Sequence, residues 1–207
     1  MTKCFLTSSF LLLALTVGFA MQAEAGPIVL DGGFEIPTPS GLGYTGSLLD
    51  GWTAALGTIG IGNVSAFWAP DVPHSGNQFA YLDWSDTVNT VSQTLTTVVG
   101  QPYLISYWVA DTSANSLSVS FGSQVLFNGT APTNGVTLVS DYVNYTYTVT
   151  AASTSTILSF TGQWLALPSD YGTLLDDVSV NAVPEPATLG FTGLGCLALF
   201  ALRRKQA

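Results

Sequence analysis

Apolar and polar residues alternate with a period of two through the middle of the chain. In Val143–Val149 (VNYTYTV) valines and tyrosines alternate with an asparagine and two threonines, which predicts a β-strand with one buried face. In Leu117–Phe121 (LSVSF) the apolar residues alternate with serines in the same way. Gln101–Asp111 (QPYLISYWVAD) is apolar on both faces, as expected of a central strand. Three further strands, rich in Thr, Val, Ile and Leu, are predicted at Thr90–Val99, Thr154–Gly162 and Thr173–Ala182.

Turn-forming residues separate these segments. They lie at Gly100–Pro102, Ser113–Ser116, Asn128–Gly135 and Pro168–Gly172. The middle of the chain has no helical period longer than about two turns. The spacing therefore predicts an all-β domain, a two-sheet antiparallel sandwich of jelly-roll topology. Gly26–Ser75 is looser, with Gly and Pro crowded into Pro37–Gly62, and long loops of this kind carry either function or variation.

The first residues have the pattern of an export signal. Lys3 supplies a positive charge, Phe5–Ala20 is apolar, and Ala23-Glu24-Ala25 is a small-residue cleavage site. Residues 1–25 are therefore predicted to be a signal peptide, and a retained N-terminal membrane helix is the alternative. Cleavage after Ala25 would leave residues 26–182 as the sandwich domain.

The tail, residues 183–207, has three parts in a fixed order. Pro184-Glu185-Pro186 comes first, then the uncharged run Ala187–Leu202, then Arg203-Arg204-Lys205. As a helix the run would span roughly 24 Å, a little short of a ~30 Å hydrocarbon core. Long basic side chains make up that difference by snorkelling, and a basic cluster favours the cytoplasmic side. The tail is thus expected to stop in the inner membrane with the domain outside the cytoplasm.

This tail resembles the PEP-CTERM sorting signal of Gram-negative bacteria that make extracellular polysaccharide. The resemblance rests on Val183–Thr188 (VPEPAT), the Gly- and Leu-rich span, and the terminal basic cluster. It implies recognition by an exosortase-type membrane protease that cuts near the motif. The expected location is the cell surface or extracellular matrix, with transient anchoring in the inner membrane. An ordinary C-terminal membrane anchor is the alternative.

The charges are distributed unevenly. The four basic residues are Lys3, Arg203, Arg204 and Lys205. All four lie in the two ends, whereas only Glu24 and Glu185 of the thirteen acids lie there. A domain without Lys or Arg cannot bind nucleic acid through phosphates. A buried carboxylate in it must find backbone N–H groups, hydroxyls, a proton or a metal cation.

The last predicted strand, Thr173–Ala182, contains a carboxylate that is expected to be buried without a basic partner. Strict alternation would put Asp176 on one face with Leu174 and Val178, pointing to the core, and Asp177 on the opposite face. Sandwich topology often brings the first and last strands together. Glu35 and Asp176 could therefore share one calcium ion, which takes six to eight oxygen ligands. The alternative is that Asp176 is protonated or capped by backbone N–H groups.

Four short segments resemble the galactose-binding-like jelly rolls of many carbohydrate-binding modules. They are Asp31–Glu35 (DGGFE), Gly51-Trp52, His74–Leu82 (HSGNQFAYL) and Leu175–Val178 (LDDV). The resemblance implies a structural calcium between Glu35 and Asp176, with oxygens from the loop around Ser75–Asn77. We therefore take as candidate ligands Glu35, Asp176, Asp31 and Asn77.

Aromatic residues are the candidates for binding sugar, because C–H faces of sugars stack on exposed rings. Trp52 and Trp108 are expected to pack inside the domain. The candidates for a stacking surface, which adjoin polar or turn residues, are Trp68, Trp84, Trp164 and Tyr171.

Catalysis has little support in the sequence. His74 is the only histidine and no GxSxG motif accompanies it, so we expect no catalytic residues and no enzyme. The function predicted is non-covalent polysaccharide binding at the cell surface. The alternatives are an adhesive protein for a protein, ice or mineral surface, and a secreted glycan hydrolase.

Overall fold

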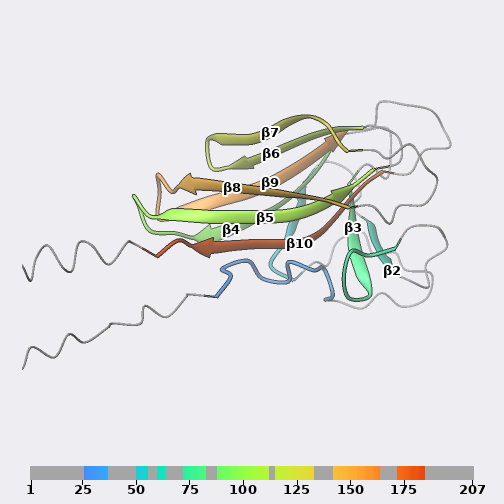
Figure 1. Ribbon diagram of the computed structural model, residues 1–207, viewed down its shortest axis with the longest axis horizontal. Coiled ribbons are helices and arrows are strands. Elements are labelled where there is room, and N and C mark those ends of the chain that lie inside the picture. Colours follow the sequence, from blue (N-terminus) through green and yellow to red (C-terminus); the bar gives the residue numbers. More distant parts are fainter. Residues whose placement is uncertain are drawn as a thin grey trace, which may run out of the picture.

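The structure, a computed structural model, describes residues 26–36, 50–55, 60–63, 72–82, 88–111, 115–132, 142–163 and 172–184. In this part of the chain, ten strands form two five-stranded antiparallel sheets that pack face to face (Figure 1). The all-β sandwich predicted from the alternation is thus confirmed. The predicted signal peptide and most of the tail lie outside the described residues.

The first sheet has the strand order β1-β4-β9-β6-β7. Its strands are β1 (Thr53–Ala55), β4 (Asn89–Thr96), β6 (Ser116–Phe121), β7 (Gln124–Thr130) and β9 (Ser155–Gln163). The second sheet has the order β2-β3-β10-β5-β8. Its strands are β2 (Gly60–Asn63), β3 (Gln78–Leu82), β5 (Pro102–Ala110), β8 (Val143–Thr150) and β10 (Thr173–Ala182). Most neighbours in each sheet are distant in sequence, so the chain crosses repeatedly between the two layers.

Each of the six segments predicted as strands coincides with one strand of the structure within a few residues. The turn predicted at Asn128–Gly135 was placed too early, because β7 continues to Thr130. The hairpin partner of β7 explains this. Ser118 pairs with Asn128 and Ser116 with Thr130, so these polar residues belong to the ladder.

The main core lies between the two sheets and contains fully buried side chains such as Val91, Ile105 and Phe160. A smaller buried cluster contains Phe79, Tyr81, Ala110, Tyr142 and Leu174, with Trp108 packed against it. Tyr81, Ala110 and Leu174 each adjoin a residue of the main core on the same strand. Successive residues of a strand face opposite sides, so this cluster lies on the outer side of the second sheet.

Strand β10 contains a β-bulge at its two aspartates. The pairing of β10 with β5 shifts register between Asp176 and Ser179, and Asp177 has a φ of +47°. Leu175 faces the main core before the bulge, whereas Val178 and Val180 face it afterwards. The prediction that Asp176 shares a face with Val178 was therefore wrong, because an extra residue in a strand reverses the side on which later side chains lie. Asp176 is nonetheless fully buried.

The opening segment runs beside β10, as predicted for the first and last segments of a sandwich. Ile28 N–H donates to Val180 O at 2.9 Å and Val178 N–H donates to Gly32 O at 2.8 Å. Strand β3 pairs with Thr173–Leu175 at the beginning of β10. The opening segment lies beside the second half of β10 (Figure 1). This arrangement brings Asp31 and Glu35 next to the bulge.

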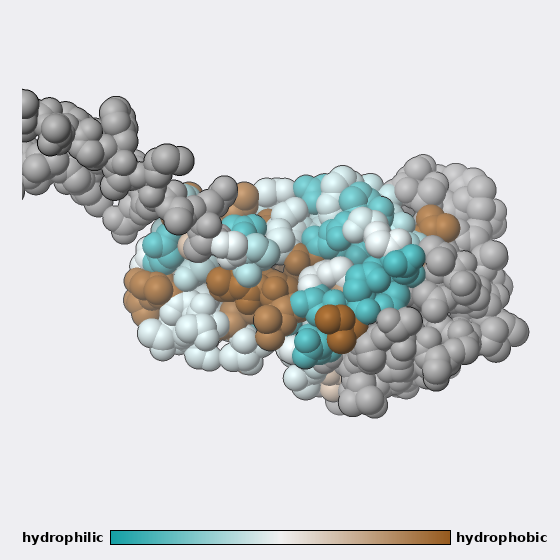
Figure 2. Space-filling model, turned by 90° about the horizontal axis from the view of Figure 1, so that it is seen from below, coloured by the Kyte–Doolittle hydropathy of each residue, from teal (hydrophilic) through white to brown (hydrophobic). Residues whose placement is uncertain are grey.

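Large apolar side chains that remain exposed are dispersed over the described residues. Examples are Leu30, Val98, Val125 and Ile157. The face drawn in Figure 2 accordingly mixes hydrophobic, neutral and hydrophilic surface. Among the residues described, no helix has the length and apolar character needed to cross a membrane.

Candidate functional site

Four carboxylates gather where the opening segment meets β10 and the segment 74–78. We call this group, Asp31, Glu35, Asp176 and Asp177 together with residues 74–78, the acidic corner. Gly33 lies in the middle of it. A Cβ at Gly33 would lie 3.7 Å from Asp177 Oδ1, 3.8 Å from Glu35 Cγ and 3.9 Å from Asp176 Oδ1.

Asp31 stabilises the turn that it begins. Its φ is +45°, and its carboxylate accepts the N–H groups of Glu35 at 2.7 Å and Ile36 at 3.2 Å. Its carbonyl oxygen accepts the indole N–H of Trp52 at 3.0 Å. Burial raises the pKa of Asp31 above its ordinary value, although the two N–H donors act in the opposite direction. The side chain of Asp31 is therefore directed at its own turn.

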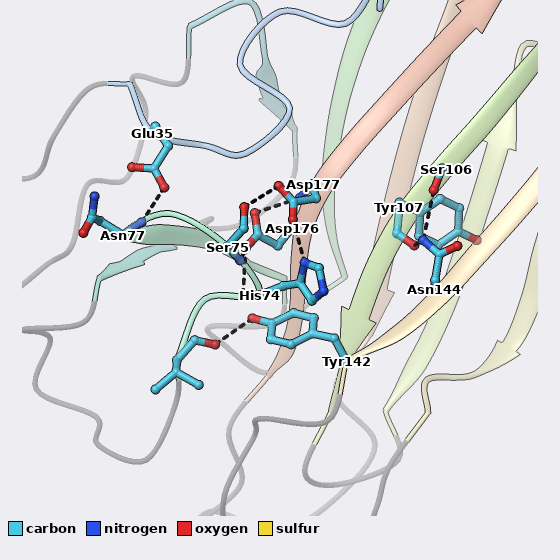
Figure 3. A network of polar contacts seen from close by, with 11 residues as sticks. Glu35, His74, Ser75, Asn77, Ser106, Tyr107, Tyr142, Asn144, Asp176 and Asp177 are labelled. Carbon is cyan, nitrogen blue, oxygen red and sulfur yellow. Dashed lines mark hydrogen bonds and ion pairs between the residues drawn. The ribbon is translucent and has the colours of Figure 1, made fainter.

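Glu35 joins the opening segment to the start of β3. Its Oε1 accepts the backbone N–H of Asn77 at 2.7 Å and of Gln78 at 3.0 Å. Asn77 contributes its backbone here, while its side-chain amide points away from Glu35 (Figure 3). Gly76 has a φ of +62°, and a Cβ on it would collide with Glu35 Oε1. Only glycine fits at this position without displacing the carboxylate.

Asp176 accepts three backbone N–H groups. Its Oδ2 receives those of His74 at 2.9 Å and Ser75 at 3.1 Å, and its Oδ1 receives that of Asp177 at 2.7 Å. Burial raises the pKa of Asp176 to about 7, and the charge of Asp177 acts in the same direction. The three N–H donors lower the pKa but do not outweigh burial.

Asp177 contacts the same two residues through their side chains. Its Oδ2 lies 2.6 Å from His74 Nδ1, and its Oδ1 accepts the hydroxyl of Ser75 at 2.8 Å (Figure 3). The expectation that Asp176 and Asp177 face opposite ways was therefore wrong, because the bulge turns both carboxylates toward residues 74 and 75. The resemblance placed Asp176 near the loop around Ser75–Asn77, but the side-chain contacts of Asp177 with His74 and Ser75 were not predicted.

The imidazole of His74 lies flat on the indole of Trp108, with ring centroids 3.8 Å apart and planes 17° from parallel. The edge of Tyr142 approaches the same imidazole, with centroids 5.5 Å apart. One face of Trp108 is thus covered, but the residue lies half-buried on the outer side of the second sheet, so the expectation that it packs inside the domain was wrong. Trp52 is buried as predicted, with 6% of its surface exposed.

Calcium would need six to eight oxygen ligands at this corner. Glu35 and Asp176 both reach it, as predicted. However, the corner directs five backbone N–H groups at their oxygens, and the positive end of an N–H repels a cation. Within the described ranges, no three His, Cys, Asp or Glu side chains lie close enough together to hold a metal ion. As placed, the residues fit backbone capping, and calcium binding stays a prediction that requires residues 74–78 to turn.

The four aromatic candidates, Trp68, Trp84, Trp164 and Tyr171, lie outside the described residues. Of the tail motif, Pro184 is described and exposed, whereas Glu185, Pro186, Arg203, Arg204 and Lys205 lie outside as well. Described strand ends flank the segments 83–87 and 164–171. Leu82 pairs with Thr173 and Asn89 with Gly162, so these strand ends lie at the same end of the sandwich.

The outer face of the first sheet carries hydroxyl groups. Its described outward residues are predominantly Ser and Thr, with no charged residue on β4, β6 or β9. Two hydroxyl pairs hydrogen-bond across strands, Thr90 to Thr161 at 2.9 Å and Ser120 to Ser159 at 2.8 Å. On β4, β6 and β9 the hydroxyl residues of this face are Thr90, Ser92, Thr94, Thr96, Ser116, Ser118, Ser120, Ser155, Ser159 and Thr161.

Comparison with known families identifies the tail. Residues 182–205 match the PEP-CTERM protein-sorting motif. This chain carries a PEP-CTERM sorting signal. The PEP-CTERM motif indicates a sorted, exported cell-surface protein that is processed by an exosortase. A search of curated proteins gave no match.

Solved structures similar to this PEP-CTERM protein are β-sandwiches. The galactotriose-bound carbohydrate-binding module TmCBM61 aligns with a TM-score of 0.54 and 13% identity, over 77% of this chain and all of that one. The Stig cyclase FisC from Fischerella sp. TAU aligns with a TM-score of 0.55 and 15% identity, over 79% of this chain and 100% of that one. The K2 adhesin domain of Lys-gingipain aligns with a TM-score of 0.50 and 15% identity, over 79% of this chain and 99% of that one. At such identities the likeness establishes the fold alone, a sandwich shared by binding modules, an adhesin and an enzyme.

Proposed function

We propose that this PEP-CTERM protein binds neutral polysaccharide at the cell surface or in the extracellular matrix, through its β-sandwich and without catalysis. The observation that carries the proposal is the direct junction of two features. Strand β10 of a sandwich like that of carbohydrate-binding modules ends at Ala182, and the sorting motif begins at the same residue. The sorting machinery would thus deliver this fold, with no spacer, to a place rich in glycan.

The charge of the domain narrows the ligand class. All acids other than Glu24 and Glu185 lie between residues 26 and 182, where the sequence has no Lys or Arg. An anionic chain would be repelled by this field, whereas a neutral chain would not. Aromatic rings then provide the main attraction, through stacking on sugar C–H faces. Trp84, Trp164 and Tyr171 are close in sequence to strand ends that lie together at one end of the sandwich, which favours that end as the binding surface.

The contacts of the acidic corner argue for a structural role. A nucleophilic serine would need its hydroxyl hydrogen-bonded to a base. Here Ser75 donates to Asp177, and His74 binds the other oxygen of the same carboxylate. Both side chains are thus engaged by one acceptor, and no serine–histidine relay is formed. We assign these residues to holding the segment 74–78 on β10.

The proposal is tested by titrating the exported chain with neutral and anionic polysaccharides while following tryptophan fluorescence. Neutral glycan should quench the emission and anionic glycan should not. Trp84→Ala and Trp164→Ala should each weaken binding about tenfold, as expected for loss of one stacking ring. Trp108→Phe is the matched control, because one face of its ring is already covered by His74. Release of reducing ends would instead support a hydrolase.

A second candidate function follows from the hydroxyl face of the first sheet. Ordered, uncharged hydroxyls at strand spacing suit a flat, neutral, hydrogen-bonding surface such as ice. Thr94→Lys would place a charge within this face and should abolish adsorption to ice while leaving polysaccharide binding intact. Adsorption unaffected by Thr94→Lys, or absent in the unmodified protein, would dismiss the second candidate.

A further inference from the structure

Strand β8 differs from the other strands at the sheet edges. The four edges of the two described sheets are formed by β1, β2, β7 and β8. Strand β1 has three residues and β2 has four. Strand β7 is interrupted by an extra residue, Leu126, between the partners of Val119 and Ser120. Strand β8 has eight residues, and its ladder with β5 runs without a register shift from Val143 to Thr150.

Short length and bulges are devices that protect an exposed edge from pairing with another chain, as are charges and prolines. Strand β8 (VNYTYTVT) has none of these devices. None of its side chains is fully buried, even those that face the core, such as Tyr145 and Tyr147. A long, uncharged, half-covered edge is what a strand presents when another strand adds to it.

The sequence of β8 indicates which strand would pair with its free edge. The side chains are nearly symmetric about Thr146: Tyr145 and Tyr147 are equivalent, and Val143 and Val149 lie two residues further out. Asn144 and Thr148 complete the pattern as a pair of small polar residues. A two-fold interface places the same patch on both subunits, so it requires a surface that complements itself. An antiparallel pair centred on Thr146 meets this requirement, with Tyr against Tyr and Val against Val.

We propose that β8 pairs antiparallel with β8 of a second copy of this chain, about a two-fold axis at Thr146, and joins two five-stranded sheets into one of ten strands. On the core side, Tyr145 would face Tyr147 of the second copy. Tyr107 already stacks on Tyr145, with ring centroids 5.5 Å apart and planes 15° from parallel. The new pair would extend this row of aromatic rings across the axis. The absence of charge on β8 removes the repulsion that two acidic domains would otherwise meet there.

The pairing predicts a cross-link at a single position. In the full chain with Cys4→Ser and Cys196→Ser, Thr146→Cys places a thiol on the axis, opposite itself in the second copy. Directly opposed residues of an antiparallel pair have Cα atoms about 4.5–5.5 Å apart, within the range of a disulfide. Mild oxidation of the detergent-purified chain should yield a covalent dimer. Thr148→Cys is the matched control, because it would face residue 144, and it should stay largely monomeric.

A second measurement does not depend on cysteine. Thr146→Lys would bring two positive charges together at the axis, and like charges directly opposite destabilise strand pairs. We expect sedimentation velocity to show a dimer for the unmodified chain and at least a roughly tenfold weaker one for Thr146→Lys. Thr94 is also an exposed threonine but lies on the other sheet, so Thr94→Lys should sediment as the unmodified chain does.

Circular dichroism and a thermal melt establish that each variant is folded. A monomeric unmodified chain, equal cross-linking at positions 146 and 148, or a Thr146→Lys dimer of undiminished affinity would each overturn the proposal. Open filaments in place of dimers would also overturn it, because a closed two-fold pair leaves no β8 edge free. Polysaccharide binding is measured separately, so its failure and the failure of the dimer are distinguishable.

Discussion

Asp176 Oδ2 accepts the backbone N–H of His74 at 2.9 Å, from a residue 102 positions earlier in the chain (Figure 3). This bond fastens the segment that leads into β3 to the bulge of β10. It is made by a carboxylate that is fully buried in a domain whose sequence has no Lys or Arg. The stability of the corner should therefore depend on the proton of Asp176.

The first prediction concerns pH. The pKa of Asp176 is raised from 3.8 to about 7, so between these values the folded carboxyl holds a proton that the unfolded one has released. The contribution of Asp176 to the free energy of unfolding is then fully present below the unfolded pKa and is lost as pH rises toward 7. The total change is up to about 4 kcal/mol. Urea unfolding at several pH values should show Asp176→Asn flattening this slope.

The control for this experiment is Asp50→Asn, which removes an exposed carboxylate. It should keep the slope of the unmodified protein. If both variants gave the same pH profile, the slope would belong to general repulsion among the acids, and the role assigned to Asp176 would be wrong.

The second prediction concerns calcium. If calcium binds between Glu35 and Asp176, saturating Ca²⁺ should raise the melting temperature by several degrees and EDTA should reverse the change. The stabilisation should grow with pH, because calcium competes with the proton on Asp176. Glu35→Gln should abolish the effect. Identical melting curves in calcium and EDTA would show that the backbone N–H groups alone satisfy these carboxylates.

The third prediction separates two reasons for glycine at residue 76. Gly76 and Gly100 both have positive φ values, +62° and +84°, but only Gly76 faces the Glu35 carboxylate. Gly100→Ala should cost about 1–2 kcal/mol for its backbone conformation. Gly76→Ala should cost about 2–3 kcal/mol more, because it also displaces Glu35 from the N–H groups of Asn77 and Gln78. Chemical denaturation measures both, and equal losses would contradict the placement of Glu35.

The fourth prediction concerns the two adjacent glycines of the opening segment. A Cβ on Gly32 would overlap the carbonyl oxygen of Val178, whereas the nearest neighbour to a Cβ on Gly33 is a side-chain atom at an ordinary 3.7 Å. Gly32→Ala should destabilise the fold by about 3 kcal/mol, because neither backbone can move without breaking the Val178–Gly32 bond. Gly33→Ala should cost less than about 1 kcal/mol. Thermal melts of the two variants side by side decide the matter.

Alternation with a period of two predicted the strands because each has one face in the main core, as in Leu117–Phe121 and Thr154–Gly162. The bulge at Asp177 escaped the same logic. A left-handed φ at a non-glycine residue leaves no mark in a hydrophobic pattern, so the faces of Asp176 and Asp177 were assigned wrongly.

The charge distribution and the motif resemblance each predicted part of the corner, the first the kind of partner and the second the residues that meet there. A domain sequence without Lys or Arg left a buried carboxylate few partners, and the three N–H groups on Asp176 are one of the alternatives that this deduction left open. Which N–H groups would serve was not predictable. Residues 74–78 are held in place by contacts with Glu35 and Asp177, and those depend on the whole sandwich.

The bond between Ile28 and Val180 also bears on how the domain would be oriented at a membrane. It holds the start of the domain next to the end of β10, so the first and last described residues lie at the same end of the sandwich (Figure 1). The strand ends at Leu82 and Thr173 lie at the opposite end of the sandwich. A domain held at a membrane by its tail would therefore present the end with Leu82 and Thr173 to the outside. Two such domains related by a half-turn at Thr146 would have their C-terminal strand ends pointing in opposite directions, a geometry suited to bridging two facing surfaces.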